Sequence, residues 1–328
     1  MILVTGGTGF LGSHLLLHLV RNKKTVVATF RKENRVKNVE KFFCSLDSNG
    51  KNIFKKILWR KCDITIIPDL QEVFNGITHV YHCAALISFS NKDIIKLNLV
   101  NKIGTQNIVN FSIKNKIKKI AYVSSIATLG NENKDNQIDE NSIWENDDYH
   151  SPYAFSKHLA ELEIWRAIEE GVPSVIINPG IILGKGIIPN PLHSLKKYIE
   201  KNIIFYPSGV AHLVLINDVV NGLFKLMESD IVNENFILVS ENWSYKDLFF
   251  LINSKKYKKN IMIKLNPFFA HLTLFIEFVL SIFFFRKRIL NFKLIKSISN
   301  SKIINGNKIK KKIDFKYSNL QKIIIEDL

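Results

Sequence analysis

The segment VTGGTGFLG, at residues 4–12, constrains the fold of this chain more than any other. It lies between MILVT, a short apolar run typical of a strand, and FLGSHLLLHLVRNK, in which leucines recur at helical spacing. A glycine-rich turn between a strand and a helix exposes backbone N–H groups and the positive end of the helix dipole to a phosphate group. This context predicts a dinucleotide site, which a glycine pattern alone would indicate only weakly.

The three glycines of this turn have different expected tasks. Gly6 permits the tight turn, Gly9 lets a pyrophosphate approach the backbone, and Gly12 allows the helix to pack closely. The expected cofactor contacts of the turn are Gly6, Thr8, Gly9, Phe10, Leu11 and Gly12.

Strand-like and helix-like segments alternate through the first half of the chain. Short apolar runs predict strands at 1–5, 25–30, 56–59, 79–84, 120–125 and 174–179. Strands that are joined through helices lie parallel, and apolar residues on both faces of a strand indicate that both faces are covered. We therefore expect an α/β fold, a Rossmann-type doubly wound parallel sheet with helices on both sides.

The regular alternation ends near residue 180. We expect an NAD(P)-binding Rossmann domain over residues 1–180 and a smaller C-terminal mixed α/β substrate-binding domain over residues 181–328, with some segments returning to the first domain. Ligands of such sheets bind at the carboxyl ends of the strands, so we expect the substrate in the cleft between the two parts.

The chain is strongly basic, because 46 Lys and Arg residues against 29 Asp and Glu residues give a net charge of +17. Its lysines recur beside Asn, Ile and Phe throughout, as in NFSIKNKIKKI, and do not gather with aromatic residues on one element. We therefore expect no nucleic-acid partner and interpret the charge as the drift of an AT-rich coding sequence.

The cysteines and the first residues indicate the compartment. Cys44, Cys62 and Cys83 follow no metal-ligand spacing and suggest no disulfide framework, so we expect no metal and a reducing environment. A strand-like run begins at Met1, in the place of a leader sequence. We therefore expect a cytoplasmic protein.

One apolar segment, FFAHLTLFIEFVLSIFFFRKR at residues 268–288, challenges this expectation. His271 and Glu277 interrupt it, and it barely reaches the roughly 18 residues that a membrane-spanning helix needs. We expect a buried or substrate-covering helix here, with peripheral membrane contact through residues 268–288 as the alternative.

The end of the second strand bears on the choice of cofactor. An NAD site has an acidic residue there that accepts hydrogen bonds from the adenosine ribose, whereas ATFRKENR offers Arg31 and Lys32. Their charge suits a 2′-phosphate, so NADP(H) is favoured; NAD(H) remains the alternative if both side chains are only solvated surface cations. Asp63 is placed to bind the adenine amino group, and the small residues Ala84 and Ala85 let backbone lie against the cofactor.

Tyr153 and Lys157, in HSPYAFSKHLAELEIWR, are four residues apart and so project from one face of the expected helix. A free tyrosine has a pKa near 10, and acid/base catalysis near neutrality asks for a pKa roughly two to three units lower. An ammonium group about 4 Å away contributes something like 4 kcal/mol at an effective dielectric constant of 20, which matches that shift. We therefore expect Lys157 to lower the pKa of Tyr153.

Taken in order, the motifs TGGTGFLG, HCAA, NKIGT, VSSIATLG, YAFSK and INPGIILG resemble the extended short-chain dehydrogenase/reductase family. The resemblance runs from Met1 to about Asn253 and is greatest to dihydroflavonol reductases, hydroxysteroid dehydrogenases and NAD-dependent epimerase/dehydratase proteins. It implies that Tyr153 is the general acid/base, Lys157 its electrostatic helper and a ribose ligand, and Ser125 the residue that orients the substrate.

The resemblance also implies roles for neighbouring residues. Asn101 matches the asparagine of the family's proton relay, with Asn98 as the alternative, and Ser124 is expected to be structural support. Together with the apolar helix that bears Tyr153, the resemblance predicts a homodimer through a four-helix contact. The remaining expected cofactor contacts are Ile64, Pro179 and Gly180.

Three functions are compatible with these motifs: a reductase, a nucleotide-sugar epimerase or dehydratase, and a non-catalytic protein that only binds dinucleotide. A binding protein needs no Ser–Tyr–Lys set. Elimination on a sugar needs a further acid and base, whereas Ser125 is followed by IAT, and SGVAHLVLINDVV lacks an arginine for a diphosphate. We therefore predict an NADP(H)-dependent oxidoreductase that reduces a carbonyl, or oxidises a secondary alcohol, on a small and fairly apolar substrate.

Overall fold

A parallel sheet forms the centre of the molecule. The computed structural model describes residues 1–133, 136–145, 150–187, 191–200, 203–253, 261–264 and 302–327. The strands of the central sheet are β1 (Ile2–Thr5), β2 (Val26–Phe30), β3 (Leu58–Lys61), β4 (His79–His82), β5 (Lys119–Val123), β7 (Ser174–Pro179) and β11 (Glu234–Leu238). The seven strands lie in the order β3-β2-β1-β4-β5-β7-β11, and every neighbouring pair is parallel. The strand order reverses between β1 and β4, which is where a doubly wound sheet binds its ligand.

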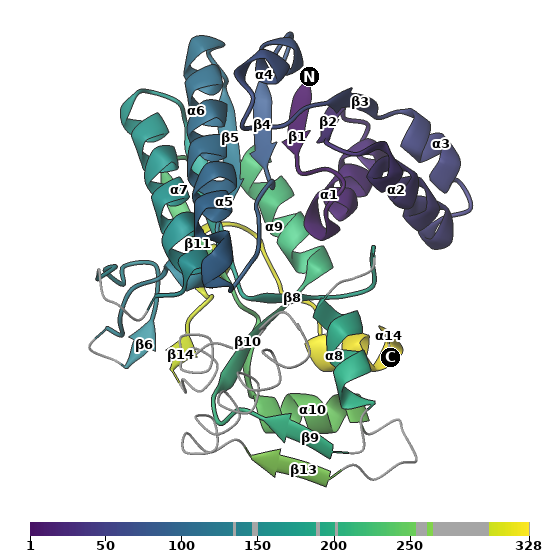
Figure 1. Ribbon diagram of the computed structural model, residues 1–328, viewed down its shortest axis with the longest axis vertical. Helices are drawn as coiled ribbons and strands as arrows, with labels where there is room; N and C mark the ends of the chain where they lie inside the picture. Colours follow the sequence, from purple (N-terminus) through teal and green to yellow (C-terminus); the bar gives the residue numbers. More distant parts are fainter. Residues whose placement is uncertain are drawn as a thin grey trace.

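Helices cover both faces of this sheet (Figure 1). They are α1 (Phe10–Arg21), α2 (Glu33–Leu46), α3 (Gly50–Lys55), α4 (Ile67–Val73), α5 (Ile94–Leu97), α6 (Gly104–Lys114), α7 (Pro152–Glu169) and α9 (Ile216–Glu228), with the 3-10 turns η1 (Asn91–Asp93) and η3 (Ile126–Thr128) and the π-helix η2 (Asn98–Ile103). Leu15 of α1 and Leu223 of α9 belong to the core on one face, and Ile108 of α6 and Ile164 of α7 to the core on the other. All four side chains have no exposed surface, as expected for strands covered on both sides.

The second half of the chain adds smaller sheets at the carboxyl ends of the central strands, in the lower part of Figure 1. Their strands are β6 (Gln137–Ile138), β8 (Ile181–Leu183), β9 (Ile203–Tyr206), β10 (Val210–Leu215), β12 (Glu241–Ser244), β13 (Ile261–Lys264) and β14 (Ile303–Ile304), and the helices beside them are α8 (Pro191–Ile199), α10 (Tyr245–Asn253), α13 (Lys308–Lys312) and α14 (Leu320–Asp327). Leu213, Phe249 and Leu320 pack in a core of their own there.

The α/β fold with a doubly wound parallel sheet is confirmed. The third strand lies two residues later than expected, at Leu58–Lys61, and the seventh strand, Glu234–Leu238, comes from beyond residue 180 together with α9. These are segments that return to the large sheet. The division of the chain into domains at residue 180 stays a prediction.

Candidate functional site

The turn between β1 and α1 needs glycine for reasons that the structure makes explicit. Gly6 has a φ of +70°, and a Cβ added there would lie 2.8 Å from the backbone of Ala84. A Cβ on Gly12 would lie only 2.2 Å from the carbonyl oxygen of Gly6. The first helix therefore packs directly on the turn, and β4 passes close behind it.

The N-terminus of α1 is open toward a ligand. Gly9 is the N-cap residue and has no side chain that could accept a hydrogen bond from the first amides of the helix. Its own N–H donates to the carbonyl of Gly6 at 2.9 Å, which holds the turn together. The N–H groups of Phe10 and Leu11 follow at the positive end of the helix dipole, where a phosphate group is stabilised.

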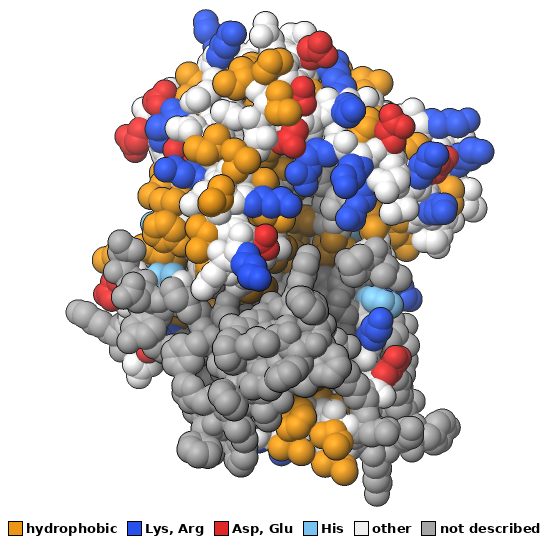
Figure 2. All heavy atoms as spheres, in the orientation of Figure 1, with side chains coloured by type: hydrophobic (Ala, Val, Ile, Leu, Met, Phe, Trp, Pro, Cys, Tyr) orange, Lys and Arg blue, Asp and Glu red, His pale blue; other side chains and the backbone are white. Residues whose placement is uncertain are grey.

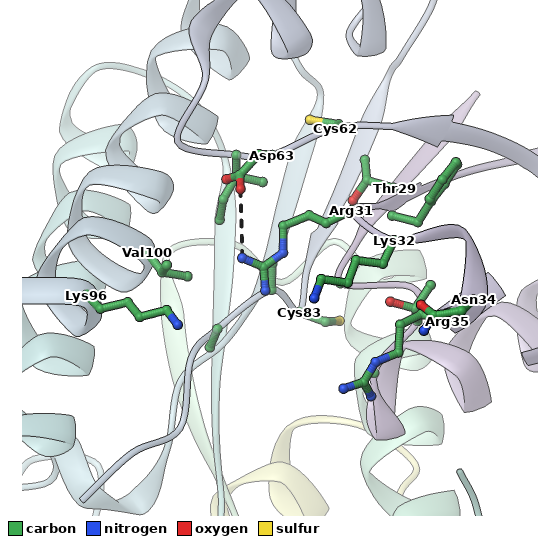
Figure 3. Close-up of a pocket in the computed structure, with 17 residues that line it drawn as sticks. Thr29, Arg31, Lys32, Asn34, Arg35, Cys62, Asp63, Cys83, Lys96 and Val100 are labelled. Carbon is green, nitrogen blue, oxygen red and sulfur yellow. Dashed lines mark ion pairs between the residues drawn. The ribbon is translucent and has the colours of Figure 1, made fainter. Parts of the chain in front are cut away.

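A cavity of about 700 Å³ lies at the carboxyl ends of β1, β2, β3 and β4 (Figure 3). Its volume is in the range of small-molecule and cofactor sites. The lining residues are Gly6, Thr8, Gly9, Thr29, Phe30, Arg31, Lys32, Asn34, Arg35, Cys62, Asp63, Ile64, Cys83, Ala84, Ala85, Lys96 and Val100. Phe10, Leu11 and Gly12, at the start of α1, are outside this lining, as are Tyr153, Lys157, Pro179 and Gly180.

One wall of the cavity is basic. Arg31 and Lys32 follow β2, and Figure 3 shows their side chains in the cavity together with Arg35 from the first turns of α2. Lys96 of α5 faces them from the opposite wall. Arg35 and Lys96 were not predicted from the sequence; for Arg35 the available signal was its spacing of four residues from Arg31.

Asp63 is the acidic residue of the cavity lining. One carboxylate oxygen accepts hydrogen bonds from the N–H and the hydroxyl of Thr65, at 3.0 and 2.8 Å, and the other lies 3.8 Å from Arg31 Nη1. The Arg31 side chain is 58% exposed, so this ion pair contributes little to stability. Asp63 thus already has partners on its own turn, and its contact with adenine stays a prediction.

The helix that bears Tyr153 and Lys157 begins where the sequence indicates. Ser151 is the N-cap of α7, with its Oγ accepting a hydrogen bond from the N–H of Ala154 at 3.1 Å, and Pro152 takes the first helical position. Tyr153, Lys157 and Glu161 follow at intervals of four residues. They therefore lie along one face of the helix.

The surroundings of Tyr153 correct one expectation. Burial raises the pKa of Tyr153 to about 12, although a hydrogen bond with the Ser125 side chain opposes the rise. Lys157 does not lower it, because Lys157 Nζ donates to the hydroxyl of Tyr122 at 2.5 Å and to the carbonyl of Val123 at 2.8 Å. The expectation that the ammonium group depresses the pKa of the phenol is therefore wrong for this arrangement of side chains.

Lys157 is 2% exposed, and its charge is costly to bury. Burial lowers the pKa of Lys157 to about 7, while the Glu161 carboxylate and the Cys83 side chain act in the opposite direction. Lys157 can therefore change its protonation state near neutral pH, unlike a solvated lysine.

Ser125 begins the short turn η3, where its Oγ accepts a hydrogen bond from the N–H of Ala127 at 3.1 Å. Ser124, its neighbour, donates instead to Glu161 at 2.5 Å. The same Glu161 oxygen accepts from Thr128 at 2.8 Å and from Asn178 at 3.0 Å. Glu161 thus fixes the strand ends beneath Ser125, a role that was not predicted from the sequence.

Asn101 lies in the π-helix η2 and is 1% exposed. Its side chain accepts from the N–H of Leu86 at 2.7 Å and donates to the carbonyl of Leu86 at 3.0 Å and to the hydroxyl of Ser156 at 2.9 Å. Asn101 therefore ties the segment after β4 to α7. A π-helix is frequent at functional sites, but a role of Asn101 in proton transfer stays a prediction.

Pro179 and Gly180 lie at the end of β7. A Cβ on Gly180 would be 2.3 Å from the carbonyl oxygen of His212, so glycine is needed there to let β10 pass. The N–H of Gly180 donates to the carbonyl of Leu238 in β11 at 3.0 Å. Their contact with the nicotinamide stays a prediction.

Two absences concern the described part of the chain, that of a metal site and that of a membrane-spanning helix. Within it, no group of three or more His, Cys, Asp and Glu side chains could hold a metal ion. No helix within it is long and apolar enough to cross a membrane. The segment at 268–288, for which we expect a covering helix or a membrane contact, lies outside the described residues.

Comparison with known proteins gives a consistent result. A family model described as Male sterility protein matches residues 4–234. Tetraketide alpha-pyrone reductase 2 of Arabidopsis thaliana is 29% identical over 77% of this chain and 82% of that protein. The putative dihydroflavonol 4-reductase of a Synechocystis strain is 29% identical over 67% of this chain and 60% of that protein. Anthocyanidin reductase of Arabidopsis thaliana is 24% identical over 79% of this chain and 81% of that protein.

Solved structures share the fold. The terminal R domain from the myxalamid biosynthetic pathway superimposes with a TM-score of 0.80 at 19% identity, over 99% of this chain and 88% of that chain. The Bordetella bronchiseptica enzyme WbmG in complex with NAD superimposes with a TM-score of 0.76 at 16% identity, over 99% of this chain and 92% of that chain. At these identities the likeness concerns the fold alone.

Proposed function

Because the chain belongs to the family described as Male sterility protein and is an NAD(P)-dependent oxidoreductase of the extended short-chain dehydrogenase/reductase type, we propose that it reduces a carbonyl group with NADPH. The observation that carries the proposal is the hydrogen-bonded pair of Ser125 and Tyr153, with Lys157 one helical turn away, at the edge of the sheet where the cofactor cavity opens. The substrate is proposed to be small and fairly apolar.

The residues of the turn fit a dinucleotide. Side chains at Gly6 or Gly12 would fill the space that the backbone needs, and the uncapped start of α1 offers amides to a pyrophosphate. When bound, the nicotinamide supplies the hydride. The protein contributes the position of the substrate and the proton.

Ser125 and Tyr153 act on the same oxygen atom of the substrate. The Ser125 hydroxyl holds the carbonyl oxygen by a hydrogen bond, and the Tyr153 hydroxyl gives that oxygen its proton. Without ligands Lys157 does not lower the pKa of Tyr153, so its proposed role, stabilising the phenolate that remains on Tyr153, applies to the complex with cofactor and substrate. The three residues therefore supply orientation, proton and charge stabilisation.

The raised pKa of Tyr153 supports reduction as the favoured direction. A phenol whose pKa lies at about 12 keeps its proton at neutral pH, so it begins the cycle as an acid. Oxidation of an alcohol would require Tyr153 to begin as a base, and its burial disfavours the charged form.

NADP(H) is the proposed cofactor because of the basic wall. Arg31, Lys32 and Arg35 stand together where an NAD site has an acidic residue, and a 2′-phosphate would lie among them. NAD(H) remains the alternative, because the Asp63 carboxylate lines the same cavity and could accept from ribose hydroxyls.

The segment that follows β4 favours an apolar substrate. The ring of Phe89 lies edge-on to the ring of Tyr153, with the centroids 5.8 Å apart, and Phe89 is 36% exposed. An aromatic side chain beside the proton donor can bind an apolar or planar substrate by burying its surface. Two relatives are named as reductases of an alpha-pyrone and of an anthocyanidin, and these names support the same class of substrate.

The decisive experiment is a screen of ketones and aldehydes in which oxidation of NADPH is followed by absorbance, with UDP-sugars in the same panel. We expect carbonyl-dependent NADPH oxidation. Turnover of UDP-sugars without net NADPH consumption would instead support the epimerase alternative, and binding of the dinucleotide without any turnover would support the non-catalytic one.

Tyr153→Phe is expected to lower kcat by at least about a thousandfold, because proton transfer is lost, while the Kd for NADPH changes less than about twofold.

The protein is also proposed to form a homodimer through α5, η2 and α7. In Figure 2, hydrophobic side chains gather over the flank of the molecule that these elements form, at the left of the view. Ile95 of α5 is 84% exposed, Leu99 of η2 46%, and Phe155 and Leu162 of α7 39% and 48%. A contiguous apolar patch of this kind on a globular protein indicates a protein interface.

The proposed location is the cytoplasm. The structure contains Cys44, Cys62 and Cys83 as free cysteines. Burial raises the pKa of the Cys62 and Cys83 thiols to about 12, so both stay protonated and unreactive. These features suit a reducing compartment.

A further inference from the structure

A chain of buried polar side chains runs beneath the catalytic helix. Lys157 Nζ donates to the Tyr122 hydroxyl at 2.5 Å, and Tyr122 in turn hydrogen-bonds the side chain of Thr105. Thr105 Oγ1 lies 2.9 Å from His82 Nε2, and His82 Nδ1 lies 2.6 Å from Thr5 Oγ1. The members come from α7, β5, α6, β4 and β1, and each is at most 2% exposed. This series of hydrogen-bonded side chains therefore connects the catalytic lysine with β1, the strand that leads into the glycine-rich turn.

The chemistry of the groups fixes the direction of every hydrogen bond in this chain. Burial, followed by the nearby charge of Lys157, lowers the pKa of His82 to about 3, so its imidazole is neutral and carries one N–H. In its ammonium form Lys157 can only donate, so the Tyr122 hydroxyl then accepts from it and gives its own hydrogen to Thr105. Thr105 then donates to His82 Nε2, and His82 Nδ1–H donates to Thr5. The structure thus assigns the Nδ1–H tautomer to His82.

We propose that Tyr122 is a positioning residue for the catalytic lysine: its hydroxyl, held in one direction by Thr105, His82 and Thr5, fixes the Lys157 ammonium group and keeps it charged. The proposal rests on the role of Lys157 in the proposed function. It adds to that role a residue of the central sheet that is fully buried and lies outside the lining of the cavity. In the described structure, Tyr122 and Val123 are the acceptors of Lys157 Nζ.

The need for such an acceptor follows from the surroundings of the amine. The titratable groups that face Lys157 are Tyr122 from β5, His82 and Cys83 from β4 and its end, and Tyr153 and Glu161 from α7. Of these, the Glu161 carboxylate and the Cys83 side chain favour the charged form of Lys157, while burial raises the pKa values of the thiol and of both phenols. A hydrogen bond from an ammonium group to a well-directed oxygen therefore provides much of its stabilisation.

The charge of Lys157 depends strongly on this hydrogen bond because the pKa of Lys157 lies near neutral pH. Because the pKa of Lys157 is about 7, a small loss of stabilisation changes the charged fraction under the conditions in which the enzyme works. Removing an acceptor of the charged form lowers the pKa of an amine further. Without the Tyr122 hydroxyl, Lys157 would be largely neutral at pH 7, and the phenolate of Tyr153 would form without a cation beside it.

The molecule contains a matched control for a test of this proposal. Tyr81 of β4 is as fully buried as Tyr122 of β5, on the neighbouring strand, but its hydroxyl has no hydrogen-bond partner among the described residues. Tyr81 belongs to the core on one face of the sheet and Tyr122 to the core on the other. Tyr122→Phe and Tyr81→Phe therefore remove the same atom from the same depth, with and without the contact to Lys157.

The first measurement uses the protein without cofactor or substrate. The Cε resonance of isotopically labelled Lys157, assigned by its loss in Lys157→Arg, is followed as a function of pH. We expect a midpoint near pH 7 in the parent protein and in Tyr81→Phe, and a midpoint lower by about one unit in Tyr122→Phe. An unchanged midpoint in Tyr122→Phe would overturn the proposal whether or not the protein is an enzyme.

The second measurement is the pH profile of NADPH-dependent reduction. We expect Tyr122→Phe to move the alkaline limb of the kcat pH profile to lower pH by about one unit and to lower kcat at neutral pH about fivefold, with both KM values within about twofold. A purely structural role would lower stability and leave the limb in place, and that result would overturn the proposal. Thr105→Val removes the partner of Tyr122 and retains its hydroxyl, so a smaller shift in the same direction is expected.

The two proposals fail in different ways. If Lys157 titrates at a lower pH in Tyr122→Phe but Tyr153→Phe retains full turnover, the positioning of Lys157 stands and the proposed acid/base role of Tyr153 is wrong. If Tyr153→Phe is inactive and the Lys157 titration does not move, the proposed function stands and the role of Tyr122 is wrong.

Discussion

At the scale of single residues, we propose that the charge on the walls of the cavity decides between NADP(H) and NAD(H). Arg31→Ala removes a guanidinium group from the place of the 2′-phosphate, which NADH lacks. We expect the KM for NADPH to rise roughly tenfold or more and the KM for NADH to change less than about twofold, because a hydrogen bond to a charged group contributes about 1.5–3 kcal/mol. Steady-state kinetics with both cofactors measure this.

Arg35 and Lys37 provide a comparison within one helix. Both are exposed residues of α2, but only Arg35 lines the cavity. Arg35→Ala should therefore resemble Arg31→Ala, and Lys37→Ala should leave both KM values unchanged. Equal losses for NADPH and NADH in Arg31→Ala would contradict the phosphate assignment.

Glu161 allows a second prediction at this scale, this time for stability. One of its oxygens accepts hydrogen bonds from Ser124, Thr128 and Asn178 in a buried site. Glu161→Gln turns three charge-assisted hydrogen bonds into neutral ones, and we expect the free energy of unfolding to fall by about 2 kcal/mol. Urea denaturation measures it, and Glu169→Gln, an exposed change on the same helix, should have no measurable effect.

The difference between Tyr153 and Tyr122 shows how far single residues can be predicted from the sequence. Tyr153 could be predicted as a site residue because its spacing from Lys157 is local and lies inside a recognisable motif. Tyr122 and Glu161 acquire their importance from contacts 35 and 37 positions away in the chain, with Lys157 and Ser124. The error about the pKa of Tyr153 has the same origin, since the position of an ammonium group among several acceptors depends on strands that the motif does not contain.

At the scale of elements, the close packing of α1 on the turn before it can be tested directly. In Gly12→Ala, the new Cβ would lie 2.2 Å from the carbonyl oxygen of Gly6, so the helix and the turn must separate. We expect the free energy of unfolding to fall by about 2–3 kcal/mol and NADPH binding to weaken strongly, because overpacking shifts the backbone amides that face the phosphates. Urea denaturation and fluorescence titration with NADPH measure the two effects.

Gly222→Ala, in α9, is the control for that change. Its Cβ would meet only the ends of the Leu238 and Ile309 side chains, at 3.3 and 3.4 Å. Alanine also favours the helix by roughly 0.5–1 kcal/mol, so the net change in stability should stay within about 1 kcal/mol. If both variants lost the same stability, the close approach at Gly12 would not explain the glycine.

The elements themselves were predictable where local pattern and environment agree. The strands before residue 180 are short apolar runs, and the structure contains each of them. β3 starts two residues later than expected because KILW and the following residues are equally compatible with a strand, and pairing with β2 sets the register. β11, with the sequence ENFIL, has only a few apolar residues, and it becomes a strand through its pairing with β7. Its identity depends on tertiary contacts that no local pattern contains.

At the scale of the whole molecule, the exposed apolar flank predicts how two copies would associate. Ile95 and Leu99 lie one turn apart, and Phe155 and Leu162 lie on the neighbouring α7. A twofold axis through this flank would place α5, η2 and α7 of one protomer against the same elements of its partner. Each side chain would then occur twice in the interface.

This doubling makes single substitutions effective. Leu162→Glu and Ile95→Glu each bring two carboxylates into a patch that would otherwise be dry, and burying an apolar side chain of this size contributes about 1.5–3 kcal/mol per copy. We therefore expect either variant to raise the dimer dissociation constant by at least about a hundredfold and to elute as a monomer at micromolar concentration. Size-exclusion chromatography with light scattering measures the mass in solution.

Ile67→Glu, on α4, is the control for these variants. It introduces the same charge at a residue that is 59% exposed and outside this flank, so it should leave the dimer intact. A parent protein that is already a monomer at these concentrations would contradict the proposed dimer.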